Sequence, residues 1–330
     1  MKVLITGATG FLGYHIAKNL KDEGHQVVNF SRSHTSELDD IDVQTIKGDL
    51  QNTDDINKAL SGVEAIFHVA SKVGMWGRWK DFYNINYIGT KNLVDAAKKS
   101  SINYFVYTST PSVVFGKDSI ENGDESLNYP DEYLSLYAKS KALGEAYVLK
   151  SNSDSFHTCA LRPHLIFGKR DKNIIPRLIE ARQRNKLKVI GDGKNLVDVI
   201  HVENAAWAHL DALKELQKEK KNAGKAYFIA QEQPVVLWSF INTILESNRQ
   251  ERITKKISVT KAYYIGLVIE LFLKLLRIYN IHPPMTRFVA LQLGTSHYFS
   301  HKRAKDDFNY HVRLNLDQSL NDVKNIRSNT

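Results

Sequence analysis

Cysteine is nearly absent from this chain of 330 residues, which contains only Cys159. A single cysteine excludes an intrachain disulfide and favours a reducing compartment. No cationic side chain is adjacent to it in FHTCALRP, so we interpret Cys159 as a small buried hydrophobe rather than a reactive thiol. The N-terminal segment MKVLITGATGFLG has no signal-peptide pattern. We therefore expect a cytoplasmic protein.

The chain also lacks a hydrophobic run long enough to cross a membrane. In its most apolar stretch, 261–281, the longest charge-free piece is 262–269, well below the roughly 18 residues of a span. Glu270, Lys274 and Arg277 are spaced to form one charged stripe on an otherwise apolar helix. Two compatible interpretations remain open: this helix covers an apolar pocket of the substrate lobe, or it associates peripherally with a membrane.

Acidic residues are scarce between Arg252 and Lys305, where ten lysines and arginines occur with one acidic residue, Glu270. The formal net charge of the chain, +9, equals the charge of this segment. Because the basic residues are localised there, we expect attraction to anionic lipid and no nucleic-acid partner. His201 and His209 do not have the spacing of a zinc site, and we expect no metal.

Glycines punctuate the N-terminal segment in the pattern of a dinucleotide-binding turn. A β-branched run at 2–6 precedes Gly7, Gly10 and Gly13, and a helical pattern follows. Gly7 permits the turn, Gly10 allows a pyrophosphate to approach, and Gly13 lets the helix pack on the strand. Further strands are expected at 27–30, 43–47, 65–70 and 105–108. This alternation predicts an α/β fold with a doubly wound parallel sheet.

The residues after the second strand determine the expected cofactor. An acidic residue there would bind a free ribose 2′-hydroxyl, but the sequence NFSRSH offers Arg32 between the hydroxyls of Ser31 and Ser33. These groups suit a 2′-phosphate. We therefore expect NADP(H) in preference to NAD(H).

Tyr137 and Lys141 are four residues apart in a helical pattern and so share one face. An ammonium beside a phenol, with the positive nicotinamide ring nearby, favours the phenolate and lowers its pKa, which makes the tyrosine an acid or base. The preceding strand ends in hydroxyls, with Thr110 as the first candidate to hold a substrate carbonyl and Ser109 as the second. Asn86 would complete a proton path.

These motifs, together with HVAS at His68, YTST and LRPHLIFG, resemble the extended short-chain dehydrogenase/reductases in order and spacing. The resemblance implies that Tyr137 is the acid/base, that Lys141 holds the ribose and tunes Tyr137, and that Thr110 orients substrate in place of the usual serine. The expected cofactor contacts, besides Tyr137 and Lys141, are Gly7, Thr9, Gly10, Phe11, Leu12, Gly13, Ser31, Arg32, Asp49, Leu50, Val69, Ala70, Pro163 and Ile166.

The segment TSTPSVVFGKDSIENGDESLNYP is similar to the 3β-hydroxysteroid and sterol-4-carboxylate 3-dehydrogenase branch. VIGDGKNLVDVIHVENAAWAHLDAL and PPMTRFVALQLGTSHYFS are most similar to bacterial 2-alkyl-3-oxoalkanoate reductases of olefin biosynthesis. This implies NADPH-dependent reduction of a ketone at the 3-position of a bulky hydrophobic substrate. The alternatives are an NAD-dependent 3β-hydroxysteroid or sterol-4-carboxylate 3-dehydrogenase and a sugar-nucleotide epimerase. Relatives are commonly dimers, so we expect a homodimer.

The substrate is expected to lie between the sheet and a smaller C-terminal lobe. We assign 1–168 to the Rossmann domain, with about 196–230 returning to it, and 169–195 and 231–325 to the substrate lobe. The aromatic segment KVGMWGRWKDFY is interpreted as a pocket wall that contributes Trp76 and Trp79, and His164 is a third candidate for contacting substrate. In that segment, Arg78 and Lys80 are the candidates for meeting a substrate carboxylate, although a solvated charge is the simpler interpretation.

Overall fold

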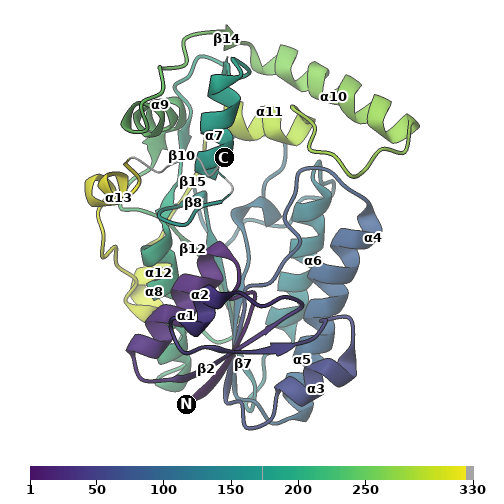
Figure 1. The fold of residues 1–330 in the computed structure, drawn as a ribbon, viewed down its shortest axis with the longest axis vertical. Coiled ribbons are helices and arrows are strands. Elements are labelled where there is room, and N and C mark those ends of the chain that lie inside the picture. The colour runs from purple at the N-terminus through teal and green to yellow at the C-terminus, as the bar shows by residue number, and fades with distance from the viewer. Residues whose placement is uncertain (173, 325–330) are drawn as a thin grey trace.

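The computed structural model describes residues 1–172 and 174–324, and within them the central feature is a seven-stranded parallel sheet (Figure 1). Its strand order is β12-β7-β5-β4-β1-β2-β3. The strands are β1 (Lys2–Thr6), β2 (Gln26–Ser31), β3 (Gln44–Lys47), β4 (Ala65–His68), β5 (Tyr104–Thr108), β7 (His157–Pro163) and β12 (Lys225–Ile229). The predicted doubly wound parallel sheet is confirmed, with the expected strands shifted by at most two residues at either end.

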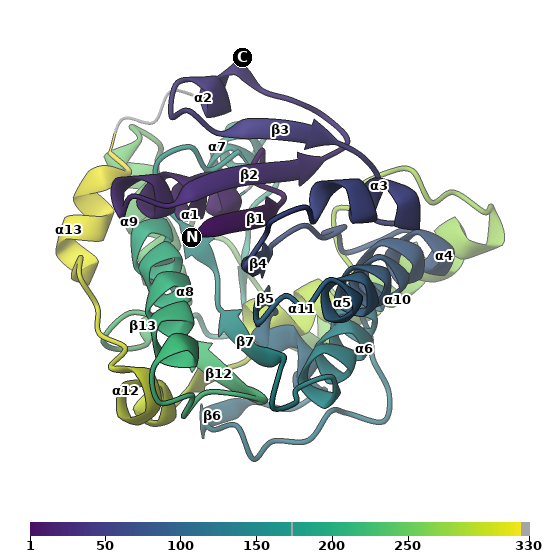
Figure 2. The same ribbon diagram turned by 90° about the horizontal axis from the view of Figure 1, so that it is seen from below.

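Helices cover both faces of this sheet, so its inner strands are buried on both sides (Figure 2). One face carries α1 (Phe11–Asp22) and α8 (Val202–Gln217), and the other carries α3 (Thr53–Ala59), α5 (Gly89–Lys99) and α6 (Leu136–Lys150). Burial on two sides explains why the inner strands are continuous apolar runs rather than alternating ones. Cys159 on β7 is fully buried, and burial raises the pKa of its thiol, as expected of a structural cysteine.

The remaining elements connect and extend this framework. They are α2 (Ser36–Asp39), α4 (Trp79–Phe82), the π-helical turn Tyr83–Ile88, the 3₁₀ turn Pro111–Val113, β6 (Ile120–Gly123), β8 (Ile166–Phe167), α7 (Ile174–Gln183), β9 (Val189–Ile190), β10 (Leu196–Val197), β11 (Ile200–His201), β13 (Val235–Val236), α9 (Leu237–Ser247), β14 (Lys256–Ile257), α10 (Val259–Leu275), α11 (Arg287–Gly294), β15 (His297–Phe299), α12 (Lys302–Phe308) and α13 (Leu316–Asp322).

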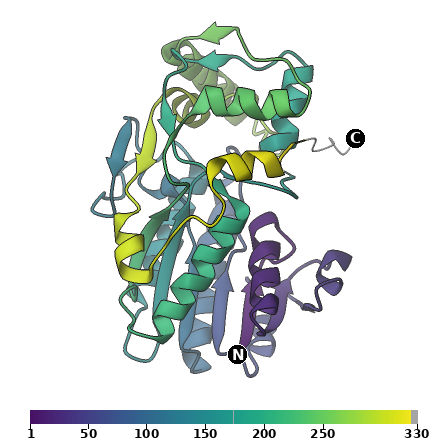
Figure 3. The same ribbon diagram turned by 90° about the vertical axis from the view of Figure 1, so that its left-hand side faces the viewer.

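The C-terminal elements gather beyond one end of the central sheet, as Figure 3 shows. A second sheet has the order β13-β10-β15-β6, and a separate core forms around α7 and α9. Near its end the chain returns to the first half, because Ala304 and Phe308 of α12 belong to the core shared by α1 and α8. The domain boundaries stay a prediction, and the last of them, at 325, lies outside the described residues.

α10 packs on α11, and the close approach of the two helices depends on Gly266. A Cβ at Gly266 would come within 2.5 Å of the carbonyl carbon of Thr286. One turn further on, Glu270 is 8% exposed and accepts hydrogen bonds from the backbone nitrogen and Nε of Arg287, both at 2.7 Å. α10 ends at Leu275, and Arg277 beyond it has a left-handed backbone with φ of 55°.

The charged stripe predicted for this segment is therefore wrong. Glu270 points inward to its arginine, and the outward side of α10 exposes mostly large apolar side chains, together with Lys261 and Lys274. Its exposed large apolar side chains are Tyr264, Ile265, Val268, Leu271, Phe272 and Leu275. We name these six residues the α10 apolar face. In the described ranges, no helix combines the length and the apolarity needed to cross a bilayer.

Candidate active site

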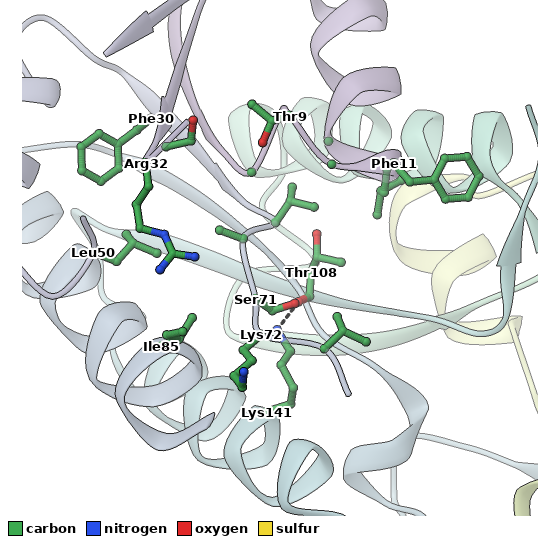
Figure 4. A pocket seen from close by; sticks show the side chains of 18 of the residues that line it. Thr9, Phe11, Phe30, Arg32, Leu50, Ser71, Lys72, Ile85, Thr108 and Lys141 are labelled. Atoms are coloured by element: carbon green, nitrogen blue, oxygen red, sulfur yellow. Dashed lines mark hydrogen bonds between the residues drawn. The ribbon is translucent and has the colours of Figure 1, made fainter. Parts of the chain in front are cut away.

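A cavity of about 620 Å³ lies where β1, β2, β4, β5 and β7 end, at the carboxyl edge of the parallel sheet. In Figure 4, Arg32 and Leu50 lie toward one end of it, and Thr108 and Lys141 lie toward the other. The cavity is lined by all the residues predicted to contact the cofactor and by four of the five predicted catalytic residues: Tyr137, Lys141, Thr110 and Ser109. Asn86, Trp76, Trp79 and His164 do not line it.

The glycine turn brings backbone close to the cavity at two positions. Gly7 has φ of 80°, and a Cβ there would lie 2.8 Å from the backbone nitrogen of Ala70. A Cβ at Gly13 would lie 2.2 Å from the carbonyl oxygen of Gly7. α1 begins after Gly10, which offers no side-chain cap, so the first amide groups of the helix are free to bind an anion. These observations fit a bound pyrophosphate.

Asn29, which the sequence reasoning missed, supports this turn from β2. It is fully buried, and its Oδ1 accepts a hydrogen bond from the backbone nitrogen of Ala8 at 3.1 Å. Its Nδ2 donates to Ser31 Oγ at 3.0 Å and to Thr45 Oγ1 at 3.1 Å. A buried polar residue inside an otherwise apolar strand was the available signal.

The other end of the cavity carries the exposed side chain of Arg32. Within the described residues, no carboxylate pairs with this guanidinium. The Ser31 hydroxyl donates to the carbonyl of Ser33 and accepts from Asn29, so it is already engaged. The cavity wall here therefore offers an available arginine, as a 2′-phosphate requires.

Tyr137 and Lys141 face the cavity from α6. Burial shifts the pKa of each side chain more than the two side chains shift each other's pKa. Burial raises the pKa of the Tyr137 phenol to about 12, and a hydrogen bond with Thr110 acts in the opposite direction. Burial lowers the pKa of Lys141 to about 7, with Glu145 opposing. The Lys141 ammonium donates to the carbonyl of Thr108 at 2.6 Å. In the protein alone, desolvation dominates the pKa of the phenol, and its lowering by Lys141 together with a bound nicotinamide stays a prediction.

A buried ion pair supports this helix from behind and was not anticipated. Glu145 is fully buried and accepts from Arg162 Nε at 3.0 Å and Nη2 at 2.6 Å, and from the Tyr129 hydroxyl at 2.6 Å. Although burial opposes ionisation, the Arg162 guanidinium holds the pKa of Glu145 below its usual value. Because Glu145 is one turn beyond Lys141, its charge favours the protonated lysine.

Asn86 holds the main chain of the cavity wall in place. Its Oδ1 accepts from the backbone nitrogen of Lys72 at 2.7 Å, and its Nδ2 donates to the Lys72 carbonyl at 3.0 Å and to Ser140 Oγ at 2.9 Å. The Ser140 hydroxyl donates to the carbonyl of Tyr137 at 2.7 Å. Every polar atom of the Asn86 side chain is therefore used to join the wall to α6.

The three predicted substrate contacts lie around the cavity rather than on its wall. Trp76 donates its indole N–H to the carbonyl of Ile278 at 2.8 Å, and the Trp79 ring lies against Tyr83 with centroids 5.3 Å apart and planes tilted by 43°. His164 is buried and its Nε2 lies 2.6 Å from Nδ1 of His297. Burial lowers the pKa of His164, so a neutral histidine pair results. Their roles toward substrate stay a prediction.

The sheet, the glycine turn and the tyrosine–lysine pair define a dinucleotide-binding oxidoreductase. Over residues 4–258 the chain matches the 3-beta hydroxysteroid dehydrogenase/isomerase family, and it belongs to that family. This confirms the resemblance drawn from the motifs, and with it the expectation of a dehydrogenase or reductase.

Relatives and solved structures agree with this assignment. The chain is 39% identical over 326 residues to the 2-alkyl-3-oxoalkanoate reductase of Stenotrophomonas maltophilia, covering 98% of both chains. It is 35% identical to the decarboxylating sterol-4-alpha-carboxylate 3-dehydrogenase of Mus musculus, covering 97% of this chain and 89% of that protein. The crystal structure of gox2253 shares the fold, with a TM-score of 0.78 and 24% identity over 97% of this chain and 96% of that one. The NAD complex of UDP-glucuronic acid 4-epimerase from Bacillus cereus shares the fold as well. Its TM-score is 0.73, and it is 21% identical over 98% of this chain and 97% of that one.

Proposed function

We propose that this protein reduces the ketone of a 2-alkyl-3-oxoalkanoate to a secondary alcohol with NADPH. The observation that carries the proposal is the placement of Tyr137 and Thr110 on the wall of one cavity, with Tyr137 one helical turn from Lys141. The substrate class rests on the relative from Stenotrophomonas maltophilia, which matches over almost the whole of both chains.

Tyr137 acts as the acid in this direction. Its raised pKa means that the phenol holds its proton at neutral pH, so it can donate that proton to the ketone oxygen as charge develops there. Thr110 orients the same oxygen with its hydroxyl. When bound, the reduced nicotinamide supplies the hydride. Lys141 holds the cofactor ribose, and its ammonium is fixed on the carbonyl of Thr108.

The cofactor we propose is NADP(H) rather than NAD(H). Arg32 lines the cavity without a carboxylate partner among the described residues, and Ser31 and Ser33 flank it where an acidic residue would favour NAD(H). The glycine turn and the uncapped start of α1 receive the pyrophosphate, and Asp49 and Leu50 border the adenine. Pro163 and Ile166 border the nicotinamide.

A second candidate function is oxidation of a 3β-hydroxysteroid or sterol-4-carboxylate with NAD. It is favoured by the 35% identity to the mouse sterol-4-alpha-carboxylate 3-dehydrogenase. The first function is tested by adding a 2-alkyl-3-oxoalkanoate and NADPH to the protein and measuring the fall in absorbance as the reduced nicotinamide is consumed. Failure with that substrate, together with turnover of a 3β-hydroxysteroid and NAD, would establish the second.

We further propose that the protein is cytoplasmic, forms a homodimer, and associates peripherally with anionic membranes through 261–281. The α10 apolar face supports the membrane association, because six large side chains are exposed on one helix beside a strongly basic segment. Their outward orientation argues against α10 being the roof of the described cavity, which none of its residues lines. Light scattering during gel filtration checks the dimer.

A further inference from the structure

Lys72 is a cation on the cavity wall. It is not among the expected cofactor contacts and does not belong to the tyrosine–lysine pair. Of the three lysines and arginines that line this cavity, Arg32 lies at the adenosine end and Lys141 is bound to the Thr108 carbonyl. In the part of the chain that the structure describes, no carboxylate or carbonyl engages the Lys72 ammonium. The nearest group recorded for it is the Phe82 ring, with the nitrogen 5.5 Å from the centroid.

The position of Lys72 relative to Tyr137 is fixed by hydrogen bonds. Both backbone polar groups of Lys72 are bound by the buried amide of Asn86, which is tied through Ser140 to the carbonyl of Tyr137. A flexible surface lysine does not require such a clamp on its main chain. The clamp therefore fixes the main chain of Lys72 relative to that of Tyr137, and the two residues line the same cavity.

We propose that Lys72 binds the carboxylate of a 3-oxo acid whose ketone is held by Tyr137. This inference rests on the proposed function and adds the group that recognises the acid. In a 3-oxo acid a single carbon separates the ketone from the carboxylate, so one site must hold both within a short distance. An ammonium bound to a carboxylate forms a charge-assisted hydrogen bond, and a substrate without the acid leaves that cation without a partner.

A neutral group at this position tests the proposal. Lys72→Gln keeps a polar chain but removes the charge, and Lys98→Gln is the matched control, because Lys98 is exposed on α5 and does not line the cavity. The substrates are a 2-alkyl-3-hydroxyalkanoate, assayed with NADP⁺ in the oxidative direction, and its methyl ester. Loss of a hydrogen bond to a charged group corresponds to roughly a tenfold to hundredfold change.

We expect Lys72→Gln to raise KM for the acid by that factor, to leave KM for the ester unchanged, and to leave NADP⁺ affinity unchanged. Lys98→Gln should match the wild type throughout. If Lys72→Gln weakens NADP⁺ binding instead, the lysine serves the cofactor phosphates and the proposal is overturned. Equal losses with acid and ester would overturn it as well.

A binding measurement separates this proposal from the proposed function. Calorimetry with the NADP⁺ complex and a 2-alkylalkanoate, which has the acid but no 3-oxygen, requires no turnover. Wild type should bind this probe at least about tenfold more tightly than Lys72→Gln, with no such difference for the corresponding amide. If the wild type turns over neither alcohol yet this difference holds, the proposed function fails and the carboxylate site stands. If it does not bind the acid, or binds acid and amide equally, the carboxylate site fails.

Discussion

The indole nitrogen of Trp76 lies 2.8 Å from the carbonyl oxygen of Ile278, a residue 202 positions away in the sequence. The Trp76 ring also stacks on Tyr279, with centroids 6.0 Å apart and planes 16° from parallel. The guanidinium of Arg78 lies 5.8 Å from the centroid of the same Tyr279 ring. The segment that contributes Lys72 to the cavity wall is thus attached to the chain that follows α10.

Removing this hydrogen bond is expected to loosen the wall. Trp76→Phe keeps an aromatic ring for stacking but has no donor for Ile278, so we expect KM for a long-chain substrate to rise roughly threefold to tenfold with kcat little changed. Met75→Ala, which changes an exposed neighbour, is the control. Steady-state kinetics check the result, and an unchanged KM would show that the contact is only structural.

Tyr137→Phe is expected to lower kcat by about a hundredfold to ten-thousandfold, because it removes the proton donor and little else. Binding of NADPH, measured by its fluorescence, should persist. Thr110→Ser should retain most activity and Thr110→Val should not, since the hydroxyl is the group that we propose orients the ketone in the cavity. A Tyr137→Phe enzyme with full activity would contradict the mechanism, and an active Thr110→Val enzyme would move the orienting role to Ser109.

The lowered pKa of Lys141 gives a stability that depends on pH. The pKa is about 7 in the folded protein against 10.5 in the unfolded chain, so between these values the unfolded state binds more protons. Stability attributable to this residue therefore rises with pH across that window. Urea unfolding of the wild type and of Lys141→Met should show the wild type gaining free energy of unfolding relative to the variant from about pH 7 upward. A difference that does not change with pH would rule out the shift.

Arg32 is expected to select the cofactor. Arg32→Ala should weaken NADPH binding by roughly tenfold to a hundredfold and leave NADH binding nearly unchanged, because only NADPH carries the 2′-phosphate. Lys98→Ala, which removes an exposed charge on α5 away from the cavity, should alter neither. Titration of nucleotide fluorescence measures both affinities. Equal losses of affinity for NADPH and NADH would show that Arg32 supports the local structure rather than binding the 2′-phosphate.

Local spacing was sufficient to predict the sheet and much of the cavity wall. Gly7 and Gly13 must be glycine because backbone approaches them closely, and that requirement is visible in the sequence. Tyr137 and Lys141 share a face because four residues make about one helical turn. These features depend on neighbours along the chain, and the structure brings them together as expected.

What the sequence did not reveal depends on partners that are distant in the chain. The orientation of α10 depends on the ion pair between Glu270 and Arg287. The sequence pattern placed Glu270 on an exposed charged stripe, whereas this ion pair turns its carboxylate inward. Arg78 and Lys80 were the candidates in the aromatic segment for binding a substrate carboxylate. The sequence did not show that Asn86 binds the main chain of Lys72 instead. Because Asn86 clamps Lys72, that lysine lines the cavity.

The α10 apolar face is expected to bind anionic vesicles. Leu271 and Leu275 are 58% and 80% exposed, so Leu271→Asp and Leu275→Asp change surface side chains at little cost to folding. Each should weaken sedimentation with vesicles of phosphatidylserine and phosphatidylcholine by about tenfold or more, because a buried methylene contributes about 0.8 kcal/mol and the added acid is repelled. Thr243→Asp, which adds the same charge at an exposed position of α9, should have a smaller effect.

Added salt should weaken the binding of the wild type to these vesicles, since the basic segment 252–305 supplies part of the attraction. Absence of wild-type sedimentation at low salt would refute membrane association through this face.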